Sequence, residues 1–265
     1  MSPITRPWKD WALGALWFSV GMRGAREYIA IQVCGLVRDD MKNYGVKRVY
    51  HFCDERYGLE NIEKSRLKVA TIMDLNDPFE LLGYSSSDSD IRRHILGFKQ
   101  SAASQFGFLC FSKSFRSPVQ WGHYANKHKG VCLGFDIPSD KIADIEYRFG
   151  RIDFDIPRYV DMNKQQRFDM MKKLLLIKHS QWRYEKEVRR ILLLSESEKE
   201  GDLYFRSFSH VGELKQVIVG CNSSITQDHL FQKLGSRSGS VECFKVRTAF
   251  RSYQIVRNKD KSLWP

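Results

Sequence analysis

The chain contains short runs in which apolar residues are continuous or alternate with polar ones, a pattern typical of β-strands. Valine, isoleucine, phenylalanine and tyrosine dominate these runs, and turn-forming residues separate them. The pattern predicts strands at Arg48–Phe52, Leu67–Ile72, Phe108–Ser112, Gly130–Asp136, Val188–Leu194, Val217–Val219 and Val241–Val246.

Other segments space their apolar residues at helical intervals. Helices are predicted at Asp54–Lys64, Ile91–Ala103, Pro118–His128, Asn163–Trp182 and Asp228–Leu234. Between the second strand and the second helix, Pro78 fixes its own φ and disfavours a helical conformation at Asp77, so Asn76–Glu80 is expected to be a turn. Helices and strands follow no regular βαβ rhythm, which predicts an α+β fold.

The domain organisation predicted is a peripheral N-terminal extension, 1–40, followed by a single domain, 41–265. Trp11–Val20 is an apolar run of ten residues, far short of the ~20 that a membrane span needs. Met41 directly precedes the first convincing strand. We therefore expect a protein that does not span a membrane and that folds without its first forty residues.

The chain is strongly basic, with a net charge of +12 over 265 residues. Its hydrophobic content of 42% is that of an ordinary folded protein. A positive surplus of this size favours a polyanionic partner, such as nucleic acid, anionic lipid or a phosphate-bearing ligand, without choosing among them.

The six cysteines include no CxxC pair, so no metal site is predicted, and the pattern suits a reducing cytoplasm. Glycine-rich dinucleotide, Walker and GxSxG motifs are absent from the sequence, which leaves the common folds that use them without support.

The most informative segment is Gln181–Ile191, which is expected to end a helix and open a strand. Alternation along that strand would place Glu185, Glu187 and Arg189 on one face. Paired carboxylates with different surroundings often divide acid, base and charge-stabilising roles in enzymes. The other interpretation is an exposed strand face on which Glu187 and Arg189 neutralise each other across neighbouring strands.

Two further segments combine histidines with aromatic residues. Tyr50 and His51 lie near the end of the first strand, and Trp121, His123 and Tyr124 lie in a segment that also contains lysines. Aromatic and basic residues in alternation suit stacking on a base or on a nicotinamide ring. A helix that docks on the core through Trp121 and Tyr124 explains the same pattern equally well.

Five motifs in register resemble the DUF2971 family over about Val46 to Ile255. They are Tyr50-His51-Phe52, Asn76-Asp77-Pro78-Phe79-Glu80, Cys110-Phe111-Ser112, Trp121-Gly122-His123-Tyr124-Ala125 with His128-Lys129-Gly130-Val131, and Trp182-Arg183-Tyr184-Glu185-Lys186-Glu187-Val188-Arg189. The late Val217–Cys221 is similar to the closing strand of that family. The family in turn resembles, more distantly, ADP-ribosyltransferases of the DarT-like and diphtheria-toxin-like kind.

This resemblance implies an ADP-ribosyltransferase-like split mixed sheet with flanking helices and an NAD-dependent mono-ADP-ribosyltransferase activity. NAD is the implied substrate, with Glu187 as the catalytic carboxylate and Glu185 addressing the acceptor. His51 would hold the nicotinamide-side ribose with Tyr50 beside it, and Arg189 or a lysine would meet the pyrophosphate. The implied NAD-binding residues are Tyr50, His51, Trp121, His123, Tyr124 and Arg189, and the ring against nicotinamide is left open between Tyr124, Trp121 and Phe111.

The basic charge favours nucleic acid, RNA or DNA, as the acceptor, with Lys172 and Lys173 expected to contact phosphates. By analogy, the implied role is a toxin or phage-defence effector with a neutralising antitoxin or inhibitor protein. The alternative is a non-catalytic nucleic-acid-binding or protein-interaction module that uses the same basic surface. If Glu187 is catalytic, replacing it with alanine is expected to abolish activity with little loss of stability.

Overall fold

The computed structural model of this chain describes residues 45–153 and 163–264. The predicted extension 1–40, the apolar run Trp11–Val20 and the domain start at Met41 lie outside the described residues.

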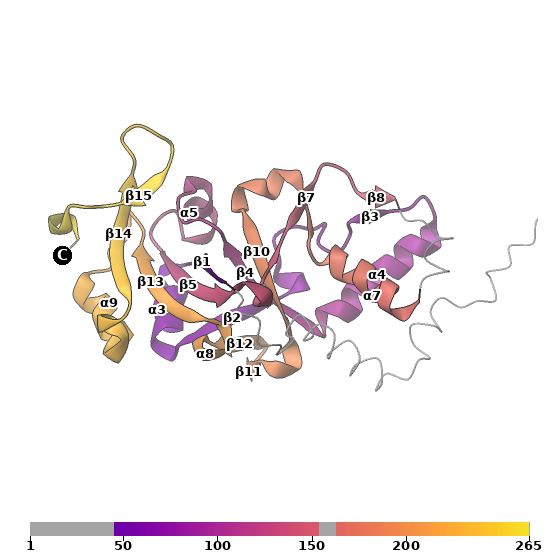
Figure 1. The fold of residues 1–265 in the computed structure, drawn as a ribbon, viewed down its shortest axis with the longest axis horizontal. Coiled ribbons are helices and arrows are strands. Elements are labelled where there is room, and N and C mark those ends of the chain that lie inside the picture. The colour runs from indigo at the N-terminus through magenta and orange to yellow at the C-terminus, as the bar shows by residue number, and fades with distance from the viewer. Residues whose placement is uncertain (1–44, 154–162, 265) are drawn as a thin grey trace, which may run out of the picture.

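The described residues form an α+β fold around a mixed, largely antiparallel sheet, which confirms the predicted fold class (Figure 1). The strand order is β11-β12-β2-β4-β1-β5-β13-β14-β15, with β10 on β4 and β6 on β10. Only β13 and β14 run parallel among the described pairs of this sheet. Its strands are β1 (Val46–Cys53), β2 (Arg66–Thr71), β4 (Phe106–Ser112), β5 (Val131–Pro138), β6 (Ala143–Asp144), β10 (Glu187–Leu193), β11 (Glu198–Glu200), β12 (Leu203–Ser207), β13 (Glu213–Val219), β14 (Glu242–Thr248) and β15 (Ile255–Arg257).

Two small parallel pairs lie beside this sheet. They are β3 (Tyr84–Ser85) with β8 (Ile152–Asp153), and β7 (Glu146–Arg148) with β9 (Ile177–His179).

The α-helices are α3 (Glu55–Lys64), α4 (Ser89–Ala103), α5 (Pro118–Tyr124), α7 (Lys164–Leu174), α8 (Phe208–Val211) and α9 (Gln227–Leu234). Short 3-10 helices are η1 (Ile72–Asp74), η2 (Ser139–Lys141), η3 (Ser180–Glu185), η4 (Leu194–Glu196), η5 (Gly235–Gly239) and η6 (Lys261–Leu263). Across the described ranges, every helix is too short or too polar to cross a bilayer.

Two predicted helices end earlier than expected. The helix predicted at Pro118–His128 stops at Tyr124 because Asn126, Lys127 and His128 all have positive φ, between 45° and 68°. The helix predicted at Asn163–Trp182 is α7 followed by β9 and η3. The reason is the apolar run 174–177, which would surround a helix with hydrophobic side chains; instead Leu174 and Leu175 enter the core, and β9 pairs with β7.

The two faces of the sheet are covered differently. On one face α3, α8 and α9 close over the largest apolar cluster, which includes Leu109, Phe111 and Val188. The opposite face carries two separate apolar clusters. One surrounds Trp121 of α5, and the other contains Phe108 with Leu174 from the end of α7.

Candidate functional site

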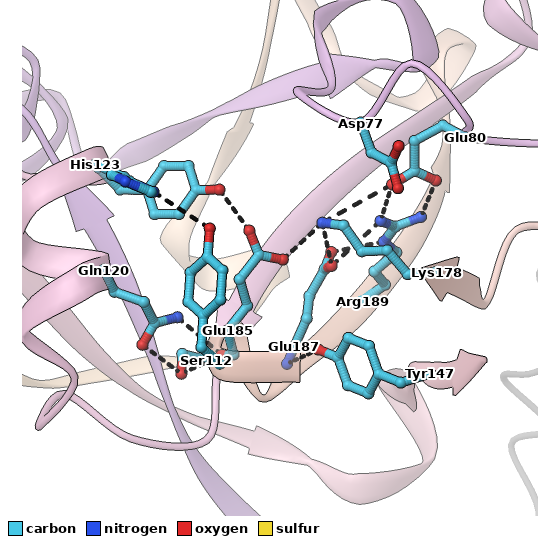
Figure 2. A network of polar contacts seen from close by, with 12 residues as sticks. Asp77, Glu80, Ser112, Gln120, His123, Tyr147, Lys178, Glu185, Glu187 and Arg189 are labelled. Atoms are coloured by element: carbon cyan, nitrogen blue, oxygen red, sulfur yellow. Dashed lines mark hydrogen bonds and ion pairs between the residues drawn. The ribbon is translucent and has the colours of Figure 1, made fainter. Parts of the chain in front are cut away.

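Five charged side chains meet on that second face, between its two apolar clusters, and we call them the ionic cluster (Figure 2). The members are Glu80, Lys178, Glu185, Glu187 and Arg189, and each is at most 8% exposed. Burying several charges costs free energy unless they are paired and hydrogen-bonded. All five side chains are paired and hydrogen-bonded.

Arg189 lies at the deep end of the ionic cluster. Its Nε donates to Glu187 Oε1 at 2.6 Å, and its Nη1 donates to Glu80 Oε2 at 2.8 Å and to the Leu175 carbonyl at 3.0 Å. Its Nη2 also donates to Glu80. The guanidinium is therefore occupied on both sides by carboxylates, and its planar group fixes where Glu187 points.

Lys178 connects the two carboxylates that the sequence singled out. Its Nζ lies 2.6 Å from Glu185 Oε2 and 3.0 Å from Glu187 Oε2. Two carboxylates this close repel each other, and the cation placed between Glu185 and Glu187 offsets that repulsion.

Glu185 lies nearest to the surface aromatic residues. Its Oε1 accepts a hydrogen bond from the Tyr124 hydroxyl. Its backbone carbonyl accepts bonds from Ser112 Oγ at 2.7 Å and from Gln120 Nε2 at 2.8 Å. These contacts tie the end of η3 to both β4 and α5.

The two carboxylates are positioned by different kinds of backbone. Glu187 begins β10, and its N–H donates to the Tyr147 hydroxyl at 2.8 Å. Glu185 instead ends η3, and Lys186 between them takes a left-handed conformation with φ of 47°. The prediction that one strand carries all three residues is therefore wrong for Glu185, although strand alternation does place Glu187 and Arg189 on one face.

The electrostatics separate the two carboxylates. Burial raises the pKa of Glu185 above its ordinary value, against the opposing effect of Lys178. Burial alone would also raise the pKa of Glu187, but the charges of Arg189 and Lys178 outweigh it and lower that pKa to about 2. The cluster has three carboxyl groups for two cations, and Glu185 is the carboxyl that takes a proton most readily of this pair.

A rim of partly exposed aromatic side chains surrounds Glu185. Tyr124 bonds it directly, the Trp182 ring lies 4.8 Å from Lys178 Nζ, and the Tyr184 hydroxyl contacts His123 Nδ1 at 3.2 Å. Tyr124, Trp182 and Tyr184 are half-buried, whereas His123 is exposed. Tyr124 and His123 are thus the predicted NAD-binding residues that the fold brings to Glu185.

His51 lies on the opposite face of the sheet from Glu187. Tyr50 and Glu187 are both registered against Ser112, so they share a face, and His51 points the other way. His51 Nδ1 bonds the Cys110 carbonyl at 2.9 Å, and burial lowers its pKa. Its ring contacts Phe111, which is buried on that same far face.

Trp121 and Arg189, two of the implied NAD-binding residues, are both buried. Trp121 is fully buried, donates from Nε1 to the Phe115 carbonyl at 2.6 Å and packs edge-on against Phe52. It docks α5 on the sheet, as the simpler interpretation of this motif had it. Of the three aromatics left open for nicotinamide, only Tyr124 is both half-exposed and in contact with Glu185.

The interpretation of an exposed Glu187/Arg189 strand face is wrong, because both side chains are buried and pair within their own strand. The same burial changes the expected outcome of Glu187→Ala. That substitution would remove the carboxylate that bonds both Arg189 and Lys178 and leave Glu80 as the counter-ion common to the two cations, so it is expected to cost stability as well as activity.

Sequence reasoning missed several members of the site. Glu80 had been assigned to a turn, and Lys178 to the helix predicted at Asn163–Trp182. The apolar run before Lys178 was the available signal, because Leu174, Leu175 and Ile177 of that run are buried together with Lys178. Partners that had no local signal are Ser112, Gln120 and Tyr147.

No group of three or more His, Cys, Asp or Glu side chains within the described residues is arranged to hold a metal ion. Glu80, Glu185 and Glu187 instead have Lys178 and Arg189 as counter-ions. The site therefore offers fixed charge and proton exchange.

Residues 120–190 match the family model described as "Protein of unknown function (DUF2971)", which confirms the resemblance to that family. The matched segment contains Gln120, Tyr124, Lys178, Glu185, Glu187 and Arg189. No curated protein and no solved structure matches the chain.

Proposed function

We propose that this protein is an NAD-dependent mono-ADP-ribosyltransferase with an ADP-ribosyltransferase-like fold, and that its acceptor is nucleic acid. The observation that carries the proposal is the pair Glu185 and Glu187, which share Lys178 yet have pKa values moved in opposite directions. Carboxylates separated in this way by their surroundings are typical of acid and base assignments in enzymes.

The reaction would use the two carboxylates in turn. When the N-glycosidic bond of NAD breaks, nicotinamide leaves with the bonding electron pair, and positive charge develops on the ribose. Glu187, ionised at neutral pH because of Arg189 and Lys178, would stabilise that charge. The acceptor oxygen or nitrogen then bonds the anomeric carbon, and its proton passes to Glu185, whose raised pKa suits a base.

Nicotinamide would lie in the aromatic rim, with Tyr124 its nearest ring. The Tyr124 hydroxyl donates to Glu185, so its ring is held in one orientation beside the reacting carboxylates. Arg189 acts as a positioning residue in this proposal, since Glu80 and Glu187 occupy its guanidinium. The pyrophosphate would be met instead by an exposed cation near the rim, for which Arg183 and Lys186 are the candidates.

The cellular role follows from the resemblance alone. An enzyme that consumes NAD and modifies nucleic acid in the cytoplasm harms its host, which fits a toxin or phage-defence effector held in check by an antitoxin or inhibitor protein. Co-purification of a tightly bound second protein from the native host would support this role.

The experiment is a nicotinamide-release assay with purified protein and NAD. Glu187→Gln is expected to lower release at least about 100-fold, whereas Glu185→Gln should lower transfer to an acceptor more than release. The control is Glu213→Gln, at an exposed carboxylate on β13, which should release nicotinamide at the unsubstituted rate.

Absence of nicotinamide release by the unsubstituted protein would favour the non-catalytic alternative. The complete pairing of the ionic cluster is what supports that alternative, because such a network also serves as a purely structural element.

A further inference from the structure

We propose that the loop of the β14–β15 hairpin is a binding surface for single-stranded nucleic acid. The loop, residues 249–254 and here called the hairpin tip, connects Thr248 to Ile255. It is closed at its base by a hydrogen bond from the Ala249 N–H to the Gln254 carbonyl, 2.9 Å long. Figure 1 shows it extending away from the sheet beside α5.

The hairpin tip exposes two aromatic rings. Phe250 is 88% exposed and Tyr253 is 100% exposed. Neither ring adds to the core of the fold, and exposing both costs free energy in water. Rings displayed in this way suit stacking on unpaired bases, because every base has an aromatic face.

The charge around the rings complements a phosphate backbone. Residues 245–261 carry six basic side chains and one acidic one, which gives this stretch a net charge of +5 out of the chain's +12. The Arg247 guanidinium lies 4.1 Å from the centre of the Phe250 ring. Arg251, between the two rings, is exposed, and its side chain forms no ion pair with any described residue.

The chemistry favours nucleic acid over a lipid surface. Arg251 and Ser252 separate Phe250 from Tyr253, so the two rings do not form a contiguous apolar segment for insertion into hydrocarbon. Burying both rings in hydrocarbon would draw a charged guanidinium in with them, at a high cost. A single strand can instead place bases on the rings and phosphates on the arginines.

The hairpin tip also connects physically with the ionic cluster. The Ile255 N–H, just past the tip, donates to the Arg116 carbonyl at 3.0 Å. Arg116 is exposed on the loop between Ser112 and Gln120, the two residues that hold the Glu185 carbonyl. A strand bound at the tip would therefore pass Arg116 towards Glu185. This path rests on the proposed function, whereas binding at the tip does not.

The test measures fluorescence anisotropy of a labelled oligonucleotide of about 12 deoxythymidines over a series of salt concentrations. Phe250→Ala with Tyr253→Ala is expected to weaken binding at least about tenfold with little change in salt slope. Arg251→Glu should reduce both the affinity and the slope, the latter by about 1. Phe149→Ala, at a ring that is 87% exposed on another loop, is the matched control and should bind as tightly as the unsubstituted protein.

A second pair of charge reversals compares the hairpin tip with the surface first expected from the sequence. Lys172→Glu with Lys173→Glu changes α7, which lies at the opposite end of the molecule in Figure 1. We expect this variant to weaken oligonucleotide binding less than Arg251→Glu does. A larger effect at α7 would overturn the assignment to the tip.

Three other results would also overturn the proposal: no oligonucleotide binding at low salt, binding indifferent to Phe250 and Tyr253, or capture of the protein by phosphatidylserine vesicles but not by the oligonucleotide. Circular dichroism of each variant shows whether it is folded. Nicotinamide release separates the two proposals. If the unsubstituted protein releases no nicotinamide but loses oligonucleotide binding when the hairpin tip is substituted, only the enzyme proposal is overturned. If it releases nicotinamide but its oligonucleotide binding does not depend on the tip, only the binding-surface proposal is overturned.

Discussion

The two faces of the β4–β10 strand pair differ in composition: one face is apolar and the other is charged. On one face Leu109, Phe111 and Val188 pack in the largest apolar cluster. On the other face, one residue along each strand, Cys110 lies opposite Arg189, and Ser112 lies opposite Glu187. The apolar face gains stability from each buried methylene. The ionic face gains only if every charge keeps its partner, and such networks are often no more stable than hydrocarbon of the same shape. The buried charges are therefore weak evidence for added stability, and the function proposed for this face lies in Glu185 and Glu187.

The largest effect is expected from Arg189→Met. It removes the guanidinium that pairs with Glu80 and Glu187 and leaves the three buried carboxylates of the cluster with Lys178 alone as their cation, so the free energy of unfolding should fall by about 3–5 kcal/mol. Denaturation in urea measures it. Lys186→Met changes an exposed cation three residues away and should stay within about 0.5 kcal/mol of the unsubstituted protein. Equal small effects would mean that the ionic cluster tolerates an unpaired charge.

The second-largest effect is an expected fall in the free energy of unfolding when the pH is lowered. The folded-state pKa of Glu187 is about 2, below its unfolded value, so its contribution is fully present above the unfolded value and is lost as the pH falls towards 2. The loss should be on the order of 3 kcal/mol. It is measured as the unfolding free energy between pH 5 and about 2.5. Glu187→Gln has no such group and should be less stable than the unsubstituted protein at pH 7, with a flatter acid limb.

The apolar face should respond to Val188→Ala with a loss of about 2 kcal/mol, because the substitution opens a small cavity beside Leu109 and Phe111. Since no titrating group takes part, that loss should be the same at pH 4 and at pH 7. A strong dependence on pH would show that the two faces are coupled through β10.

The smallest effect is expected from Glu185→Gln. Because the pKa of Glu185 is raised in the folded state, its ionisation lowers stability as the pH rises through and above the unfolded value. The glutamine variant escapes that cost and should be at least as stable at pH 7 as the unsubstituted protein. Thermal melts at pH 4 and pH 7 measure the difference. A clear destabilisation at pH 7 would show that the bond to Lys178 outweighs the cost of burial.

The same two faces show what can be predicted from a sequence. The apolar face was predictable, because the apolar pattern that indicates β1, β4, β5 and β10 lies in consecutive residues of the sequence. The ionic face was predictable only in part. Local periodicity placed Glu187 and Arg189 on one side of a strand. Glu185 was singled out because it lies two residues before Glu187 in the sequence, although its backbone belongs to a 3-10 helix.

Glu80 could not be connected to Arg189 from the sequence, because 109 residues separate them and no local pattern encodes that pairing. Lys178 was assigned to the wrong element, because the predicted helix was continued from the helical spacing of 163–173 through the apolar run 174–177, whereas α7 ends at Leu174. The face on which His51 lies also required the register of β1 against β4, a property of two strands together.

The separation of Glu80 and Arg189 has a consequence for synthesis on the ribosome. At a rate of about 5–20 residues per second, the chain carries Glu80 for roughly 5–20 seconds before Arg189 has been added. During that time the carboxylate has no guanidinium to meet, and β4 lacks the strand β10 that carries it. Any nascent or prematurely terminated product that ends before Lys178 lacks both cations and two of the three carboxylates of the cluster. The ionic cluster can therefore be completed only after the chain has been made at least as far as Arg189.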